Sequence, residues 1–345
     1  MKISCCFREE IILILLLILA LPHLTAQKID TVYFQGGDRI TGEVKGLNNN
    51  QLRLSTYDAS TLNIEWNKVD SVRILSTMRI VLSNGTILYG RVIPAGPDKG
   101  SYIQQQNRDL RQVRLNEIVA MSRLEDRWLG RLDGTLSSGF SYTKASDVMQ
   151  FNLNGSVNFT AKKNQYNLFY DGIFTRESGD HTQRQNGGIT FRRLLPRKFF
   201  LVSSLTGESS SEQNLDLRTS FGIGAGNSLV YTNTTHFFAA AGFLGNREWS
   251  GSTSRYNLEG KVTLNYTVYI YESPEVSLTL RFDLIPSLTN LGRVRTQVDS
   301  NMRWEIFSDF FLKWTFFHNF DNRPLSESAS KTDWAISLLG IEYKL

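Results

Sequence analysis

The side chains that could do chemistry are concentrated in the segment 293–305, where charged and amide residues alternate with less polar ones. The polar residues occupy every second position and are Arg293, Arg295, Gln297, Asp299, Asn301, Arg303 and Glu305. Residues two apart in a β-strand point to the same face, so the segment predicts a strand with one strongly polar side. Neighbouring segments with the same alternation add Glu259, Lys261, Arg281 and Asp283 to that side. Either these charges line a narrow channel and set its ion preference, or opposite charges pair and fill an enclosed interior.

Histidine offers a second kind of chemistry, the Ser/His pair of a lipid hydrolase. His181 follows Asp180 and lies near Ser178, and His318 precedes Asn319. The Gly-x-Ser-x-Gly motif of many hydrolases does not accompany them, and proximity in sequence is weak support for a catalytic pair. The sequence also lacks His, Cys, Asp and Glu at metal-ligand spacing and a phosphate-binding glycine loop. We therefore expect no enzyme, no metal and no cofactor.

Composition excludes several classes of protein. The chain has 345 residues, of which 41% are hydrophobic, 21% charged and 12% aromatic, with a formal net charge of +5. The aromatic content excludes a disordered chain. The continuous apolar run, 11–21, is shorter than the roughly 20 residues that a membrane-spanning helix needs. Basic residues are interspersed with acidic ones, so no nucleic-acid partner is expected. Few prolines and many Thr, Asn, Tyr and Phe residues favour an all-β fold.

The N-terminus has the pattern of a secretory signal peptide. The apolar run is followed by Pro22 and then by Leu24-Thr25-Ala26, which ends in small residues of the kind that a signal peptidase recognises. We predict that residues 1–26 are removed, with an uncleaved anchor as the alternative. Cys5 and Cys6 precede the apolar run, so they leave with the signal and the mature chain carries no thiol.

Residues 27–126 contain an internal repeat. The segment 34–44 matches 82–92, and the segment 67–69 matches 116–118. Each copy reads as a strand, a glycine turn and further strands, which predicts a duplicated small SH3-like or Sm-like β-domain in the periplasm. Some Sm-like domains bind RNA, but an aromatic platform with a basic rim is missing here, so an interaction or spacer module is favoured.

From residue 127 to 345 the chain consists of long segments of alternating polarity. They exceed the roughly 5–6 residues of an ordinary strand. We predict twelve strands, at 132–142, 149–161, 165–175, 184–194, 199–206, 215–225, 235–244, 256–268, 276–285, 293–305, 308–317 and 332–343. An even number of such strands fits a bacterial outer-membrane barrel, whose tilted strands need roughly 9–11 residues to cross the hydrocarbon core.

The connections and the two faces indicate how such a barrel is oriented. Predicted outer loops at 176–183, 207–214, 246–255 and 319–331 are longer and more polar than most predicted inner turns, as in outer-membrane barrels. The inner connection 226–234 is long for a turn. One face of the strands is polar along its whole length, which favours contact of the other face with lipid over the core of a soluble sandwich. A charge that faces lipid costs roughly 2–4 kcal/mol, so the polar face is expected to line the lumen.

Several motifs give the segment 130–345 a family resemblance. They are Gly139-Phe140-Ser141-Tyr142, Gly222-Ile223-Gly224-Ala225-Gly226, Asp321-Asn322-Arg323-Pro324, Lys331-Thr332-Asp333-Trp334 and the terminal Ile341-Glu342-Tyr343-Lys344-Leu345. In them the chain resembles the bacterial family called domain of unknown function 481, whose members are often labelled salt-induced outer membrane proteins. The resemblance implies an outer-membrane barrel and no settled activity. The repeat lies outside it, and Leu345 stands where such barrels usually end in Phe.

Together these features predict an exported all-β protein of the Gram-negative envelope. Its fold is a transmembrane antiparallel β-barrel of about twelve strands in the cell outer membrane, preceded by the periplasmic β-domain. Its expected role is a narrow pore, in the manner of a porin, or an envelope-stress function. The alternative is a non-conducting structural or interaction barrel whose N-terminal domain docks a periplasmic protein, and the third is an outer-membrane lipid hydrolase. Outer-membrane lipid and the barrel-assembly machinery are the expected partners.

Overall fold

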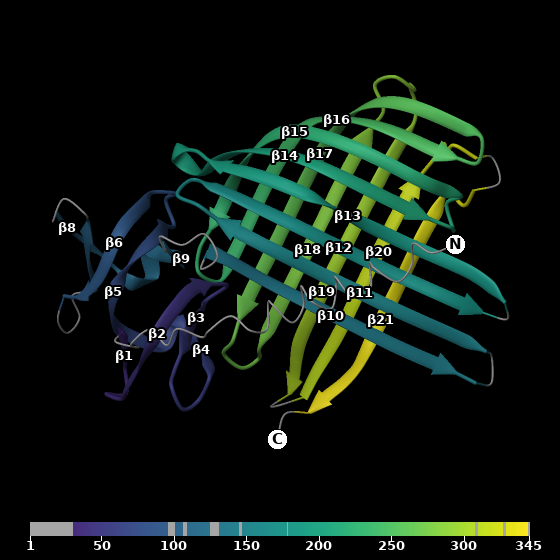
Figure 1. Ribbon diagram of the computed structural model, residues 1–345. Helices are drawn as coiled ribbons and strands as arrows, with labels where there is room; N and C mark the ends of the chain where they lie inside the picture. Colours follow the sequence, from purple (N-terminus) through teal and green to yellow (C-terminus); the bar gives the residue numbers. More distant parts are fainter. Residues whose placement is uncertain are drawn as a thin grey trace, which may run out of the picture.

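The computed structural model of the chain is built from β-strands, with short 3₁₀ turns between some of them (Figure 1). It describes residues 30–95, 101–105, 109–124, 131–144, 147–177, 179–307, 310–326 and 329–343. The predicted signal peptide, with Cys5 and Cys6, lies outside the described residues. Within them, no helix has both the length and the apolar composition needed to cross a membrane.

The first nine strands form one sheet, which we call the front domain. They are β1 (Asp30–Phe34), β2 (Arg39–Asn48), β3 (Gln51–Ser55), β4 (Thr61–Glu65), β5 (Val69–Leu82), β6 (Ile87–Pro94), β7 (Ser101–Gln105), β8 (Leu110–Val113) and β9 (Ile118–Arg123). Their order is β4-β3-β2-β1-β5-β6-β7-β8, and β9 pairs with both β2 and β5.

One hydrophobic core holds the front domain together. Its fully buried side chains come from both halves of the repeat, such as Val44 from the first and Ile80 from the second. The indole Nε1 of Trp66 donates to the carbonyl oxygen of Leu115 in the other half, at 2.9 Å. The long strand β5 belongs to both halves, because its first part pairs with β1 and its last part with β6 and β9. The repeat therefore builds one folded unit with a shared core.

The two halves of the front domain turn in the same way. Gly37 follows β1 with φ +90°, and Gly85 follows β5 with φ +83°, a left-handed conformation that glycine adopts without strain. The amide of Gly37 donates to Phe34 O at 3.0 Å, and that of Gly85 donates to Leu82 O at 2.8 Å. The glycine turns expected from the sequence are therefore present, with equivalent hydrogen bonds.

The remaining strands form a twelve-stranded antiparallel sheet in simple sequence order. They are β10 (Leu132–Thr143), β11 (Val148–Thr160), β12 (Asn164–Glu177), β13 (Asp180–Leu194), β14 (Phe199–Ser210), β15 (Leu215–Tyr231), β16 (Thr235–Ser250), β17 (Thr253–Ile270), β18 (Val276–Pro286), β19 (Val294–Phe307), β20 (Phe310–Asp321) and β21 (Thr332–Tyr343). Each of the twelve strands predicted from the sequence is present, so the predicted number is confirmed.

Several of these strands run past their predicted ends. β15 continues to Tyr231, so the connection that looked long for a turn shrinks to residues 232–234. Asn227 and Ser228 break the apolar alternation, but they still lie opposite Ala239 and Phe238 in the β15–β16 ladder. Backbone pairing, not side-chain polarity, decides where a strand ends, and this explains why the predicted strands were too short.

The twelve-stranded sheet is rolled about a central axis, with β10–β13 crossing in front of β17–β20 in Figure 1. We call it the rolled sheet. Ladders of hydrogen bonds join all neighbouring strands from β10 to β21, and among the described residues no ladder joins β10 to β21.

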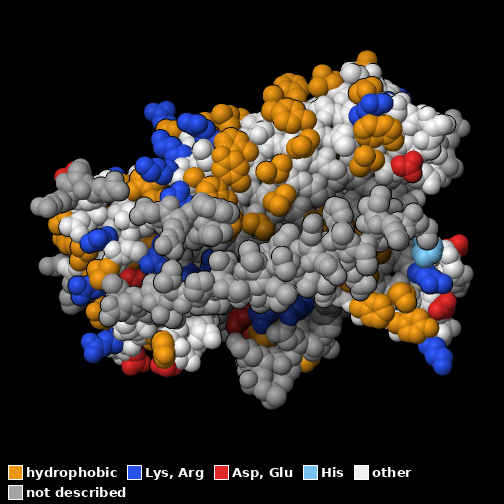
Figure 2. All heavy atoms as spheres, viewed as in Figure 1, with side chains coloured by type: hydrophobic (Ala, Val, Ile, Leu, Met, Phe, Trp, Pro, Cys, Tyr) orange, Lys and Arg blue, Asp and Glu red, His pale blue; other side chains and the backbone are white. Residues whose placement is uncertain are grey.

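The rolled sheet is apolar outside and polar inside. Along β17, Tyr256, Leu258 and Leu264 are exposed, whereas Asn257 and Glu259 are buried. Figure 2 shows hydrophobic side chains spread over the outer surface of this part of the molecule. This is the reverse of a soluble sandwich, in which the face that carries the large apolar residues is the buried one.

The front domain packs against the turns at one end of the rolled sheet (Figure 1). We call this the near end and the opposite one the far end. Arg79 Nε donates to the carbonyl oxygen of Lys162 at 2.7 Å, and Tyr89 Oη donates to the same oxygen at 3.0 Å. Asn67 Nδ2 donates to Glu272 Oε1 in another turn at 2.5 Å. The near end is thus held by contacts to at least two separate turns.

Gly242 marks a point where β15 and β16 leave no room for a side chain. A Cβ there would overlap Ile223 O and lie 2.6 Å from Gly224 Cα. We expect Gly242→Ala to lower the free energy of unfolding by about 1–3 kcal/mol, because the strands must separate. The measurement is urea unfolding in detergent, followed by tryptophan fluorescence. Gly245→Ala is the control, since its Cβ would meet nothing nearer than 4.0 Å; equal losses in both variants would contradict the close approach.

Candidate functional site

The far half of the rolled sheet encloses buried ion pairs centred on Glu248, which we call the far cluster. Glu248 lies on β16 and is 0% exposed. Its Oε1 accepts hydrogen bonds from Arg218 Nε on β15 at 2.8 Å and from Arg293 Nη2, just before β19, at 2.9 Å. Arg293 also binds Asp321 through Nε at 3.1 Å and Nη2 at 2.5 Å. Arg218 Nη1 binds Glu208 on β14 at 2.8 Å. Five charged side chains thus form one continuous network.

Contacts at the far end cross the interior of the rolled sheet. Arg218 Nη2 and Asp321 Oδ2 are 4.0 Å apart, although β15 and β20 are not neighbours in the sheet. Arg184 on β13 places its guanidinium 3.6 Å from the centre of the Phe317 ring on β20, and its Nε lies 3.9 Å from Asp333 Oδ2 on β21. Side chains of such distant strands meet across the interior of the rolled sheet, so the polar face points inward and these side chains occupy the far half.

Two further groups contain five of the eleven polar residues that the sequence singled out. Arg295 and Glu259 form a buried pair, with Nη2 and Oε2 2.5 Å apart. Lys261 Nζ and Arg281 Nη2 lie 3.1 and 2.9 Å from the same oxygen of Asp283. Each of these carboxylates has a cationic partner, as buried charges require.

The other predicted residues are placed apart from the far cluster. Arg303 Nη1 binds Glu275 Oε2 in a near-end turn at 2.7 Å. Glu305 Oε2 accepts from the backbone amide of Glu275 at 2.8 Å, so both residues anchor that turn. Asp299 is exposed and lies opposite Arg281 in the β18–β19 ladder. Residues that point to the same side of one strand therefore lie in three different environments, at different depths along the rolled sheet.

Sequence reasoning missed four members of the far cluster: Glu208, Arg218, Glu248 and Asp321. Glu208, Glu248 and Asp321 lie in segments that were predicted as outer loops, because polar residues interrupt the apolar alternation at the ends of these strands. Continuing the two-residue period beyond the predicted strand ends would have placed Glu208 and Glu248 on the inward face.

The histidines considered for hydrolysis show no bond to serine among the described residues, and Ser178 lies outside them. His181 is exposed at the start of β13, and the His318 ring is parallel to that of Phe316 with centroids 6.5 Å apart. Another pair does form, since Ser228 Oγ and His236 Nε2 are 3.0 Å apart. In the described part of the chain no carboxylate binds the other ring nitrogen, so this pair lacks the orienting group of a hydrolytic triad.

A chamber of about 1020 Å³ lies between the front domain and the near end. A smaller space of about 180 Å³ continues from it into the rolled sheet, and Arg192 and Arg281 line both. Gly222, Gly224 and Gly242 on β15 and β16 make room for the smaller space. Further along these strands comes the far cluster, which therefore lies between the chamber and the far end.

Removing the central carboxylate should destabilise the rolled sheet strongly. Glu248→Leu leaves two buried arginines short of a partner, so we expect a loss of about 3–5 kcal/mol in the free energy of unfolding, measured by urea titration in detergent. Glu177→Leu replaces an exposed carboxylate at the end of β12 and should change it by less than about 0.5 kcal/mol. A loss below about 1 kcal/mol in Glu248→Leu, the size expected of an exposed pair, would refute the role of the far cluster.

Among the described residues there is no group of three or more His, Cys, Asp or Glu side chains that could hold a metal ion. Comparison with known proteins identifies the family of the chain. The chain matches the model of the family described as "Protein of unknown function, DUF481" over residues 137–343, which covers most of the rolled sheet and none of the front domain. Neither a curated protein nor a solved structure matches it. Because the match spans more than half of the chain, the protein belongs to the DUF481 family.

Proposed function

We propose that this chain is an outer-membrane protein whose rolled sheet closes into a barrel between β10 and β21 within the lipid. The apolar outer face supports lipid contact, because soluble proteins seldom expose large apolar areas. Strands of 11 to 18 residues in its second half are long enough to span the hydrocarbon core. An open sheet edge in lipid would leave backbone groups without hydrogen bonds, and this supports closure.

In this proposal the near end faces the periplasm, and the front domain, two fused copies of a small SH3-like unit, lies there. Two far-end connections, 287–293 and 322–331, are longer than the near-end turns, such as 161–163 and 232–234. The predicted outer loops 176–183, 207–214 and 246–255 are shorter than expected, because the strands continue into them and leave 178–179, 211–214 and 251–252. Short periplasmic turns and longer outer loops are the usual arrangement in outer-membrane barrels.

The role that the geometry supports best is that of a non-conducting barrel, which holds the front domain at the membrane as a binding module. The far cluster carries this inference, because Arg293 and Glu248 are buried, paired and joined to strands on both sides of the interior. An ion on its way through would have to separate such pairs, at a cost of about 3–5 kcal/mol when one partner is lost. A narrow pore is the second candidate, favoured by the space that already continues from the chamber into the rolled sheet. We propose no catalytic role.

The membrane part of the proposal can be tested by fractionation. We expect the full chain in the outer-membrane fraction, and we expect the unheated protein to migrate faster on a gel than the boiled one, because a closed barrel resists detergent. Recovery of the mature chain as a water-soluble monomer would overturn the proposal.

Conductance in planar bilayers tests whether the barrel is blocked. We expect no current above that of the bare bilayer for the natural protein. The double variant Glu248→Ala/Arg293→Ala removes one charge of each sign from the far cluster and should admit ions, provided that its gel migration still changes on heating. Glu177→Ala is the matched control and should pass no current above that of the bare bilayer. Steady current through the natural protein would favour the pore.

A further inference from the structure

The chamber at the near end has an excess of positive charge. Eight lysine or arginine side chains line it, against one carboxylate, Asp133, among its described lining residues. At least four of the eight have carboxylate partners: Lys45, Arg53, Arg123 and Arg281. The far cluster, by contrast, has two arginines for three carboxylates. The imbalance is therefore specific to the space between the front domain and the rolled sheet.

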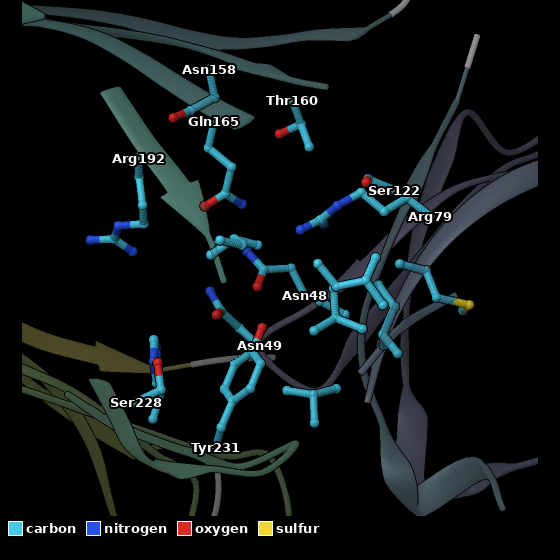
Figure 3. A pocket seen from close by; sticks show the side chains of 18 of the residues that line it. Asn48, Asn49, Arg79, Ser122, Asn158, Thr160, Gln165, Arg192, Ser228 and Tyr231 are labelled. Carbon is cyan, nitrogen blue, oxygen red and sulfur yellow. The ribbon is translucent and has the colours of Figure 1, made fainter. Parts of the chain in front are cut away.

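Arg79 and Arg192 bring this charge into the chamber from its two walls (Figure 3). Arg79, on β5 of the front domain, is 3% exposed, and its buried Nη2 has no hydrogen-bond partner. Arg192, on β13, lies with its guanidinium carbon 4.7 Å from the Phe200 ring centre and 5.2 Å from that of Phe238. Neither arginine has an ion pair in the described part of the chain. Arg79 is buried and Arg192 half-buried, and a cation without an anion is costly in such places. These two side chains therefore suit an anion that the described residues do not supply.

The neighbourhood of Arg79 is consistent with an absent anion. Burial holds the pKa of its guanidinium below the usual value, and Tyr231 and Tyr89 oppose that effect only in part. An arginine remains charged in proteins all the same. Tyr231, Asn158 and Gln165 line the chamber beside the two arginines (Figure 3) and offer neutral hydrogen-bond donors.

The chamber also has an apolar wall, which Leu47, Val81, Val119 and Met121 of the front domain provide. We propose that the chamber binds a phosphate-bearing amphiphile, with the phosphate between Arg79 and Arg192 and the apolar part along this wall. Planar guanidinium groups match phosphate oxygens in a two-pronged geometry. A chamber of about 1020 Å³ has room for far more than an inorganic anion. This inference goes beyond the proposed function and holds whether or not the barrel conducts.

Native mass spectrometry of the full chain in detergent tests the site. The probes are phosphatidic acid and phosphatidylcholine with the same acyl chains, and inorganic phosphate as a competitor. We expect phosphatidic acid to be retained and phosphatidylcholine, whose headgroup charge is balanced, to bind more weakly. Equal binding of the two lipids would overturn the proposal. Displacement of phosphatidic acid by inorganic phosphate at equal concentration would identify a free phosphate as the ligand and would refute the amphiphile.

Matched variants locate the binding. Arg192→Met leaves the Arg79–Lys162 contact intact and should weaken retention of phosphatidic acid roughly 10- to 100-fold, as expected for lost hydrogen bonds to a charged group. Arg79→Met should do the same. Arg73→Met alters an exposed arginine on the same strand as Arg79 and should bind as the natural protein does. Unchanged binding in a folded Arg192→Met protein, shown by its heat-dependent gel migration, would place the lipid elsewhere and overturn the proposal.

Discussion

The pairing of buried charges is the constraint on which the rolled sheet depends. Glu248 has no contact with solvent, and two arginines reach it, one from β15 and one from the residue just before β19. A charge so placed is tolerated only where opposite charges and hydrogen bonds surround it. Because those partners lie on strands that are not neighbours, satisfying the charges also fixes how tightly the sheet is rolled. Electrostatic satisfaction inside and apolar exposure outside are two results of the same alternating sequence.

The pairing of charges differs between the two ends of the rolled sheet. At the far end each charged member of the far cluster has a partner of opposite sign, which gives a filling of linked ion pairs. At the near end Arg79 and Arg192 have no acidic partner among the described residues, and apolar side chains line the same chamber. A matched network resists change, whereas an unmatched one gains from a ligand. This contrast supports the two proposals, namely ligand binding at the near end of the rolled sheet and a blocked far end.

The sequence predicted the number and position of the twelve strands, because a two-residue period over a dozen residues is a strong signal. It did not predict their ends, since Asn227 and Ser228 look like turn residues but keep their backbone pairing. The sequence grouped Arg293 with Asp299 and Arg303 because all three occupy alternate positions of one segment. In the structure they lie at different depths along the rolled sheet and have different surroundings. The partners of Arg293 were out of reach, because Glu248 and Asp321 come from other strands and depend on how the sheet rolls. The chamber was equally hidden, as its walls join β5 to β13 across more than a hundred residues of sequence.

The guanidinium of Arg184 over the Phe317 ring has a consequence for assembly. Ladders between successive strands are hairpins that can form early, because little chain must be ordered to close them. The Arg184–Phe317 contact joins residues far apart along the chain and exists only once all the hairpins between them are in place. Formation of the filled interior is therefore a step of high contact order, of the kind that slows the folding of β-proteins.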